Sequence, residues 1–199
     1  DITERKENER KLREAMAEVA DLRDRLEQEN AYLQEAIVSE RAHHDILGRA
    51  PAIRQLLSKV DLVAPTDATV LLEGEAGTGK ALVATAIHKD SPRQRRALIH
   101  FKCGSVPPDA MEAELFGQMR GACPGALRDK PGKLELAHGG TLFLDDVTEI
   151  PLEHQGRLLN ALQQGHVTRL GGENARDIDI RVIAASTSPL ERAVSEGRF

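Results

Sequence analysis

Aromatic side chains are scarce in this sequence, and tryptophan is absent from it. Aromatic residues make up 3% of the 199 residues, whereas hydrophobic residues of all kinds make up 40%. An aromatic core is therefore excluded, and a folded core must be built from leucine, valine, isoleucine and alanine. The length and composition are typical of one ordinary domain with an appendage.

Cysteine is scarce as well, and its spacing excludes the common cysteine-based sites. Cys103 and Cys123 are far apart and form no C-x-x-C pair. We therefore expect neither a zinc site nor a disulfide, as is usual in a reducing, cytoplasmic setting. The histidines are scattered, and the one adjacent pair, His43 and His44, has no carboxylate or cysteine at ligand spacing. This pattern argues against a metal site there.

Long apolar runs are missing, which excludes a membrane-spanning helix of about 20 residues. The first ten residues, DITERKENER, are polar and charged, so they do not form a signal peptide. We therefore predict a cytoplasmic protein with no membrane partner. The sequence starts without methionine and stops abruptly at SEGRF, so we expect a fragment of a longer protein.

An excess of positive charge is also missing. The net charge is −5, which gives the whole chain no attraction to nucleic acid. The basic stretch SPRQRR offers Arg93, Arg95 and Arg96. No aromatic residues are interleaved with them to stack on bases, so we interpret the stretch as a solvated loop.

Residues 1–45 contain neither glycine nor proline and have helical periodicity. Four apolar residues recur every seven positions: Leu12, Val19, Leu26 and Leu33. Ala15 and Leu22 lie three positions after members of this set, and Asn30 and Ile37 lie four positions after members of it. Such heptads indicate a coiled coil that self-associates, with Asn30 placed to fix its register. A lone solvated helix is the alternative.

The pattern changes near Asp45, where Gly48 and Pro51 interrupt the helical periodicity. Residues 46–199 contain four short apolar runs, ATVLLE, ALIHF, GTLFLD and IRVIAAS, with helical stretches between them such as KALVATAIHKD and EHQGRLLNALQQG. Alternating strands and helices predict an α/β fold with a parallel sheet flanked by helices. A chain of this size buries roughly 70% of its unfolded surface, which is enough for a core.

The stretch LLEGEAGTGKALV has the spacing of a phosphate-binding loop. Gly74, Gly77 and Gly79 follow an expected strand and precede an expected helix, which is the context that this motif requires. The glycines let backbone N–H groups turn toward phosphate oxygens, and the helix N-terminus adds a positive dipole end. Lys80 would reach the β- and γ-phosphates as a point charge.

A second stretch, GGTLFLDDVTEIP, ends an apolar strand in two acids. This places Asp145 and Asp146 at the carboxyl edge of the sheet, beside the phosphate loop. Magnesium keeps several waters and needs few protein ligands, so Asp145 would hold it through water. Asp146 would then polarise an attacking water.

Taken in order, several stretches resemble the AAA+ module of bacterial enhancer-binding proteins, the ATPases that activate sigma-54 RNA polymerase. They are ILGRAPAI, GEAGTGKALVATAIH, AELFGQMRGACPGA, GKLELAHGGTLFLDD, and RLLNALQQGHVTRLGG with DIRVIAAS. The stretch RLEQENAYLQEAI is similar to the linker helix before that module in some members.

The resemblance implies an ATP-driven ring, usually a hexamer, with ATP between subunits and a surface loop that pushes on sigma-54. The implied contacts of ATP and magnesium are Gly48, Arg49, Gly74, Glu75, Ala76, Gly77, Thr78, Gly79, Lys80, Ala81, Asp145 and Asp146. The implied catalytic residues are Lys80, Asp146 and Thr187, and the implied sigma-contact loop is Gly121, Ala122, Cys123, Pro124, Gly125 and Ala126. Promoter DNA would be recognised by a separate helix-turn-helix domain that this sequence does not contain.

Several of these positions depart from the family's usual residues. Ala81 replaces a glutamate, which should leave ATP binding intact. The loop usually reads GAFTGA, and Cys123 and Pro124 replace its phenylalanine and threonine. Asp146 replaces the general-base glutamate. One methylene less withdraws the carboxylate by about 1 Å or more, a displacement that can cost about 10²-fold in rate.

Three further differences concern hydrolysis. Lys102 aligns with the asparagine that holds the base, and we expect it to pair with Asp146 instead. Thr187 replaces the usual sensor asparagine, and Phe199 ends the sequence just before the family's arginine pair. Such trans-acting arginines can add about 10³–10⁵ in rate. We therefore predict an ATP-binding regulatory module with weakened hydrolysis and weakened contact with sigma-54 RNA polymerase.

Other interpretations stay open. The chain can be a fully active sigma-54 activator in which these departures are tolerated. It can also be a coiled-coil dimerisation and signalling module in which ATP is only a structural ligand. A different P-loop ATPase, such as a helicase or clamp loader, fits the GACPGA-type insertion before GGTLFLDD poorly.

Overall fold

The computed structural model describes Met16, Ile46, residues 50–123 and residues 126–199. The chain divides into two units after Asp45, and all described residues except Met16 belong to the second. The predicted coiled coil over residues 1–45 lies outside the described residues, apart from Met16, and stays a prediction. Gly48, Arg49, Pro124 and Gly125 also lie outside them.

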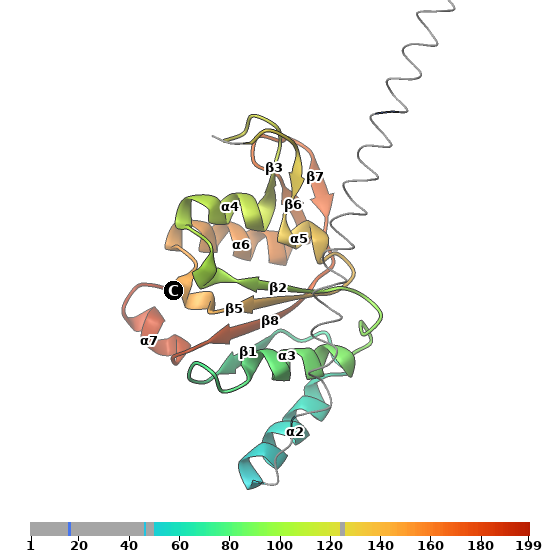
Figure 1. Ribbon diagram of the computed structural model, residues 1–199, viewed down its shortest axis with the longest axis vertical. Coiled ribbons are helices and arrows are strands. Elements are labelled where there is room, and N and C mark those ends of the chain that lie inside the picture. Colours follow the sequence, from blue (N-terminus) through green and yellow to red (C-terminus); the bar gives the residue numbers. More distant parts are fainter. Residues whose placement is uncertain (1–15, 17–45, 47–49, 124–125) are drawn as a thin grey trace, which may run out of the picture. The chain divides into compact units, whose positions relative to one another are not determined.

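A four-stranded parallel sheet forms the centre of this unit (Figure 1). Its strands are β1 (Val70–Glu73), β2 (Leu98–Lys102), β5 (Thr141–Asp145) and β8 (Arg181–Ser186), in the spatial order β1-β8-β5-β2. The two inner strands, β5 and β8, are buried along most of their length, as expected for strands covered on both faces. The four apolar runs of the sequence are these four strands, so that prediction is confirmed.

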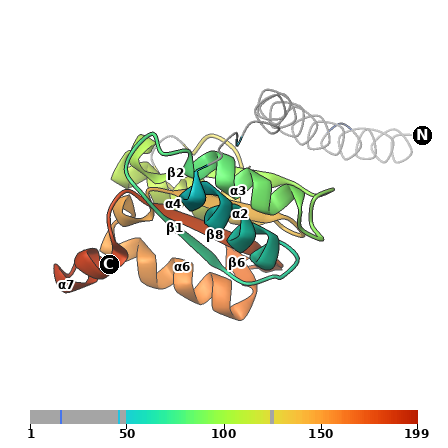
Figure 2. The ribbon, with the colours of Figure 1, turned by 90° about the horizontal axis from the view of Figure 1, so that it is seen from below.

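Helices cover both faces of the sheet (Figures 1 and 2). One face carries α2 (Pro51–Val63) and α3 (Lys80–Lys89), and the other carries α4 (Pro108–Phe116), α5 (Lys133–Leu136) and α6 (Leu152–Gln164). The short helix α7 (Leu190–Ser195) follows β8. Val60 of α2 and Val83, Ala84 and Ile87 of α3 pack with Phe143 and Ile183 into one apolar core. The expected α/β fold is therefore confirmed.

Two small hairpins project from the helical layer that contains α4 and α6. They pair β3 (Gly117–Gln118) with β4 (Lys130–Pro131), and β6 (His166–Thr168) with β7 (Ala175–Asp177). The first hairpin is so close at its base that a Cβ on Gly117 would lie 2.6 Å from the Gly132 nitrogen. Gly117 also has a φ of 81°, in the left-handed region that favours glycine. A parallel bridge between Gln118 and Leu170 joins the two hairpins.

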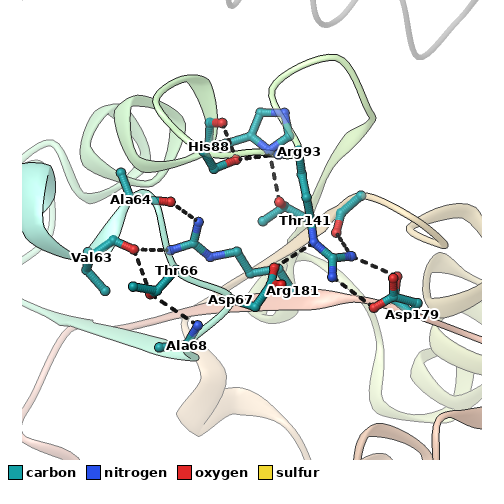
Figure 3. A network of polar contacts seen from close by, with 12 residues as sticks. Val63, Ala64, Thr66, Asp67, Ala68, His88, Arg93, Thr141, Asp179 and Arg181 are labelled. Atoms are coloured by element: carbon teal, nitrogen blue, oxygen red, sulfur yellow. Dashed lines mark hydrogen bonds and ion pairs between the residues drawn. The ribbon is translucent and has the colours of Figure 1, made fainter.

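A buried arginine fastens α2 to the sheet at the start of β8 (Figure 3). Arg181 is 1% exposed, and its guanidinium donates hydrogen bonds of 2.8 Å to the carbonyls of Val63 and Ala64. These carbonyls end α2, where the helix dipole is negative and favours a cation. Burial lowers the pKa of the guanidinium, and the helix end compensates part of the cost of its desolvation.

A second set of polar contacts joins α3 to the same edge of the sheet (Figure 3). His88 Nε2 lies 3.1 Å from the Arg96 carbonyl, and His88 Nδ1 lies 2.9 Å from the Thr141 hydroxyl. A carbonyl only accepts, so Nε2 carries the proton and Nδ1 accepts from Thr141. Burial lowers the pKa of His88, which keeps the ring neutral. Arg93 adds two ion pairs at this edge, one with Asp67 and one with Asp179.

We expect Arg181→Ala to lower the free energy of unfolding by about 2–4 kcal/mol, because it leaves the Ala64 carbonyl without its donor and opens a cavity. Urea unfolding followed by circular dichroism measures this change. Arg192→Ala removes an exposed arginine whose one ion pair within the described residues is with Glu196. It serves as the control, with no measurable effect expected. An Arg181→Ala protein as stable as the unaltered chain would contradict this role of Arg181.

Candidate functional site

The glycine-rich loop connects β1 directly to α3 at the carboxyl edge of the sheet. Gly77 and Gly79 have φ values of 80° and 89°, which residues other than glycine rarely adopt. Gly79 is the N-cap of α3, and the helix begins at Lys80. The amides of the first helical turn therefore have no partner within the helix and are available to an anion.

The Lys80 side chain folds back over the loop. Its ammonium group donates to the carbonyls of Gly74 at 2.7 Å and Glu75 at 3.0 Å. The Thr78 hydroxyl donates to the Glu75 carbonyl at 2.8 Å. A Cβ on Gly74 would lie 3.0 Å from the Thr78 oxygen, so the curve of the loop leaves little room for a side chain there. Lys80 thus holds the loop in a compact form with its charge beside the helix N-terminus.

The end of β8 lies next to this loop. The Gly74 amide donates to the Ser186 carbonyl at 3.2 Å, and Thr187 follows Ser186 directly. Asp145 ends β5, which pairs with β8 and not with β1. β8 therefore lies between the strand that leads into the loop and the strand that carries Asp145. Lys80, Thr187 and Asp145 still meet at one edge, because parallel strands end on the same side of a sheet.

Asp145 has a neighbour that the sequence did not predict. Its side chain is 19% exposed, and its Oδ2 lies 3.4 Å from His100 Nε2. The alternation in LIHFK puts His100 and Lys102 on one face of β2, and the strand register pairs Lys102 with Asp145. The register depends on which strands are neighbours, and the sequence does not reveal this. The alternation in LIHFK was the only sequence feature that pointed to a shared face for His100 and Lys102.

The expected ion pair between Lys102 and Asp146 is not formed. Among the described residues, no ion pair joins Lys102 to a carboxylate, and its side chain is exposed. The reason is geometric, because β2 presents Lys102 opposite Asp145, while Asp146 lies beyond the end of β5. That correction leaves Asp146 without the predicted cationic partner.

Asp146 adopts an unusual backbone conformation. Its φ of 57° makes it the one residue other than glycine with positive φ in the described part of the chain. Aspartate tolerates this left-handed region better than most residues. Its Oδ1 is buried, with no hydrogen-bond partner in the structure. A buried acceptor without a partner is costly, and at a candidate active site it indicates a ligand position.

Cys103 lies close to these carboxylates, but its thiol is unreactive. Its side chain is fully buried. Burial, together with the charges of Asp145 and Asp146, raises the pKa of the thiol to about 12. Cys103 therefore stays protonated at neutral pH and is not a nucleophile.

The residues at this edge fit a nucleoside triphosphate with magnesium. The loop supplies free amides and the Lys80 charge for phosphates, and Asp145 and Asp146 supply oxygen atoms at the same edge. No cluster of three or more potential metal ligands occurs among the described residues.

The expected sigma-contact segment forms a tight turn in its described part. The Gly121 amide donates to the Ala126 carbonyl at 2.8 Å, and the Ala126 amide donates to the Cys123 carbonyl at 3.0 Å. The Cys123 thiol lies 3.2 Å from Gln118 Oε1, the acceptor of its hydrogen bond. A Cβ on Gly171 would lie 2.8 Å from the Ala122 Cβ, so this turn contacts the second hairpin closely.

Charged contacts that the sequence did not predict support the second hairpin. Glu135 of α5 accepts from Arg169 at 2.8 and 2.7 Å, and from Arg176 at 2.8 Å. Arg157 of α6 pairs with Glu112 and donates to the Thr168 carbonyl at 2.7 Å.

No helix in the described part of the chain is long and apolar enough to cross a membrane.

Comparison with known proteins agrees with this geometry. The profile of the family described as "Sigma-54 interaction domain" matches residues 46–199. The DNA-binding transcriptional activator HyfR of Escherichia coli K12 is 42% identical over 186 residues, which cover 94% of this chain and 28% of HyfR. A Nif-specific regulatory protein of Azorhizobium caulinodans is 40% identical over 194 residues, which cover 91% of this chain and 32% of that protein.

A crystal structure of NtrX from Brucella abortus in complex with ATP has a similar fold. Its TM-score is 0.72 at 34% sequence identity, and the match covers 86% of this chain and 39% of that one. This chain thus spans about a third of the length of the relatives that it matches. Three findings point to the same family: the profile match over residues 46–199, the sequence identities, and the strand–loop–helix arrangement around Gly74–Lys80. The chain therefore belongs to the Sigma-54 interaction domain family of AAA+ proteins.

Proposed function

We propose that this chain is the ATP-binding module of a sigma-54-dependent transcriptional regulator, with slow hydrolysis and weakened contact with sigma-54. The observation that carries the proposal is the loop between β1 and α3, where Lys80 and the free amides of the helix N-terminus converge. Crystals of NtrX with ATP support the nucleotide as ligand. Two alternatives, a fully active activator and a signalling module with ATP as a structural ligand, are separated by the measurements below.

The nucleotide would lie with its phosphates along the loop. Lys80 would exchange the carbonyls of Gly74 and Glu75 for phosphate oxygens, since its ammonium has only three protons to donate. The implied contacts Ala76 and Thr78 are exposed on the loop, and Ala81 lies in the first turn of α3. We keep Gly48 and Arg49 as proposed contacts of the nucleotide, although they lie outside the described residues.

Magnesium would be held by Asp145 through water molecules. The partly exposed Asp145 carboxylate and the unpartnered oxygen of Asp146 fit a cation that needs few protein ligands. The ion would neutralise charge on the phosphates. His100 lies beside Asp145 Oδ2 and orients the carboxylate from the solvent side.

Hydrolysis is proposed to be slow because Asp146 is a short base. Its carboxylate is attached one methylene closer to the backbone than that of the glutamate usual in the family, and a shift of about 1 Å can cost about 10²-fold in rate. The Oδ1 atom is buried, which further limits its access to water. Thr187 would replace an asparagine as the polar group that senses the γ-phosphate.

Contact with sigma-54 RNA polymerase is proposed to be weak. Cys123 hydrogen-bonds to Gln118 in its own hairpin, and it offers far less apolar surface than the phenylalanine usual there. Gly121, Ala122 and Ala126 belong to the same turn. Pro124 and Gly125 lie outside the described residues, and Pro124 would replace a hydroxyl-bearing contact.

Self-association would proceed through the coiled coil of residues 1–45 and through an AAA+ ring. DNA recognition is proposed to belong to a separate domain of the protein. A cytoplasmic location follows from the proposed role in transcription.

Lys80→Ala should abolish tight binding of magnesium and ATP. Loss of two charge-assisted contacts costs about 3 kcal/mol, or about 100-fold in Kd. Isothermal titration calorimetry on the folded chain measures this. Lys89→Ala, at the other end of α3, is the matched control and should bind as the unaltered chain does. A Kd unchanged by Lys80→Ala would remove the proposed site.

Asp146→Glu should raise the rate of ATP hydrolysis by about 10–100-fold, because the longer side chain brings the base toward the water. Steady-state phosphate release from the assembled protein measures the rate. Asp146→Asn keeps the size of the side chain and should lower the remaining activity. A fast unaltered enzyme would favour the fully active alternative.

Replacing Cys123 by phenylalanine and Pro124 by threonine should increase sigma-54-dependent open-complex formation by the full-length protein. The new side chains restore the apolar and hydroxyl contacts of the loop without touching the nucleotide site. Permanganate footprinting of promoter DNA measures open complexes. If the unaltered protein already opens promoters as well as the double variant does, the loop is not weakened.

A further inference from the structure

A carboxylate at the end of β1 reaches across to the helix that follows β8. Glu73 Oε1 accepts a hydrogen bond of 2.8 Å from the Leu190 amide, although the two residues are 117 positions apart in the sequence. Leu190 is the first residue of α7. The hydrogen bond therefore joins the strand that leads into the phosphate loop to a separate helix.

The capping of α7 depends on this contact. Its N-cap is Pro189, which supplies no side-chain cap. The Leu190 amide belongs to the first turn of a helix, where amides have no partner within the helix. Glu73 provides both an acceptor and a negative charge at the positive end of the helix.

The segment between β8 and α7 is also held at its other end. The Gly74 amide donates to the Ser186 carbonyl at 3.2 Å. The Ser186 hydroxyl donates to the Ser188 carbonyl at 2.5 Å, and the Ser188 amide donates back to that hydroxyl at 3.3 Å. Thr187 thus lies between two attachments to β1 and its loop, one at Gly74 and one at Glu73.

The residue after Glu73 is the first that Lys80 contacts. Lys80 holds the carbonyls of Gly74 and Glu75, and it would have to release both in order to bind phosphate. Their release changes the constraints on the backbone directly next to Glu73. A change in the loop therefore acts on a residue that already holds the N-terminus of α7.

The far end of α7 is fastened as well. Gln155 Nε2 of α6 lies 2.8 Å from both the Ile150 and the Arg198 carbonyl and donates to each. Ile150 follows the short 3₁₀ turn Val147–Glu149, whose N-cap is Asp146. The helix is therefore linked to the phosphate loop at its start and to the segment after the acidic pair beyond its end.

We propose that Glu73 is a positioning residue that transmits nucleotide binding from the phosphate loop to Thr187 and α7. The proposal rests on the nucleotide-binding function proposed above. Glu73 itself does not touch the nucleotide. It sets the position of the segment that carries Thr187, and it couples that position to the state of Lys80.

Hydrogen exchange of backbone amides in the full chain, followed by NMR, tests the proposal. Without nucleotide, Glu73→Ala should speed exchange of the Leu190 amide by about fivefold, the effect of losing a helix cap. Glu73→Gln keeps an oxygen acceptor and should restore slow exchange. Glu191→Ala removes a carboxylate from the same helix end. Glu191 makes no hydrogen bond or ion pair to the described residues, so it serves as the matched control.

Magnesium with ATP provides the second measurement. In the unaltered chain and in Glu73→Gln, the nucleotide should change exchange at Thr187 and in α7. In Glu73→Ala, this change should disappear, while core amides of β5 exchange as before and calorimetry still detects binding. A merely structural role of Glu73 would leave the nucleotide response in place.

Two results would overturn the proposal. Equal exchange of the Leu190 amide in Glu73→Ala and the unaltered chain would show that Glu73 does not hold α7. A nucleotide response in α7 that survives in Glu73→Ala would show that the coupling runs elsewhere. If the unaltered chain binds no nucleotide, the proposed function and the coupling both fail, and exchange at Leu190 without nucleotide still decides on the contact itself.

Discussion

The hydrogen bonds from Arg181 to the last carbonyls of α2 constrain the central strand of the sheet from its first residue. β8 lies between the strand that carries the phosphate loop and the strand that carries the acidic pair. Its last residue, Ser186, accepts from the Gly74 amide. One strand therefore connects the buried edge of the sheet, where α2 ends, to the edge where the nucleotide is proposed to bind. The relative positions of the loop, Thr187 and Asp145 all follow from the placement of β8.

The second hairpin is supported separately from the nucleotide edge. Glu135 connects α5 to Arg169 and Arg176 of the second hairpin, and Arg157 connects α6 to α4 while its guanidinium lies 4.3 Å from the centre of the Phe116 ring. Charged contacts in such partly buried places are stronger than on an open surface. The turn that contains Cys123 is held by its own backbone hydrogen bonds and by its close approach to Gly171, so the departure at Cys123 concerns the contacting side chain. The contact proposed with sigma-54 and the contacts that hold the turn in place thus depend on different residues.

The sheet was predictable because its strands are continuous apolar runs, and the loop was predictable because its glycines and Lys80 lie at fixed spacing. The order of the strands was not, since periodicity along the chain says nothing about which strands are neighbours. This is why the sequence suggested an ion pair between Lys102 and Asp146, whereas the strand register places Lys102 opposite Asp145. Contacts such as His100 with Asp145, or Glu73 with Leu190, join distant parts of the sequence. Nothing in the local pattern of either residue marks them.

The two cysteines differ in a way that has a practical consequence. Cys103 is buried and its thiol has a pKa of about 12, so maleimides and iodoacetamides, which react with thiolates, should pass it by. Cys123 is only half-buried and lies in the turn proposed to face sigma-54. Of the two cysteines in this chain, only Cys123 therefore offers an attachment point for a fluorophore or spin label, in the turn proposed to contact sigma-54. Reports from that probe would follow the loop through a nucleotide cycle without any engineered cysteine.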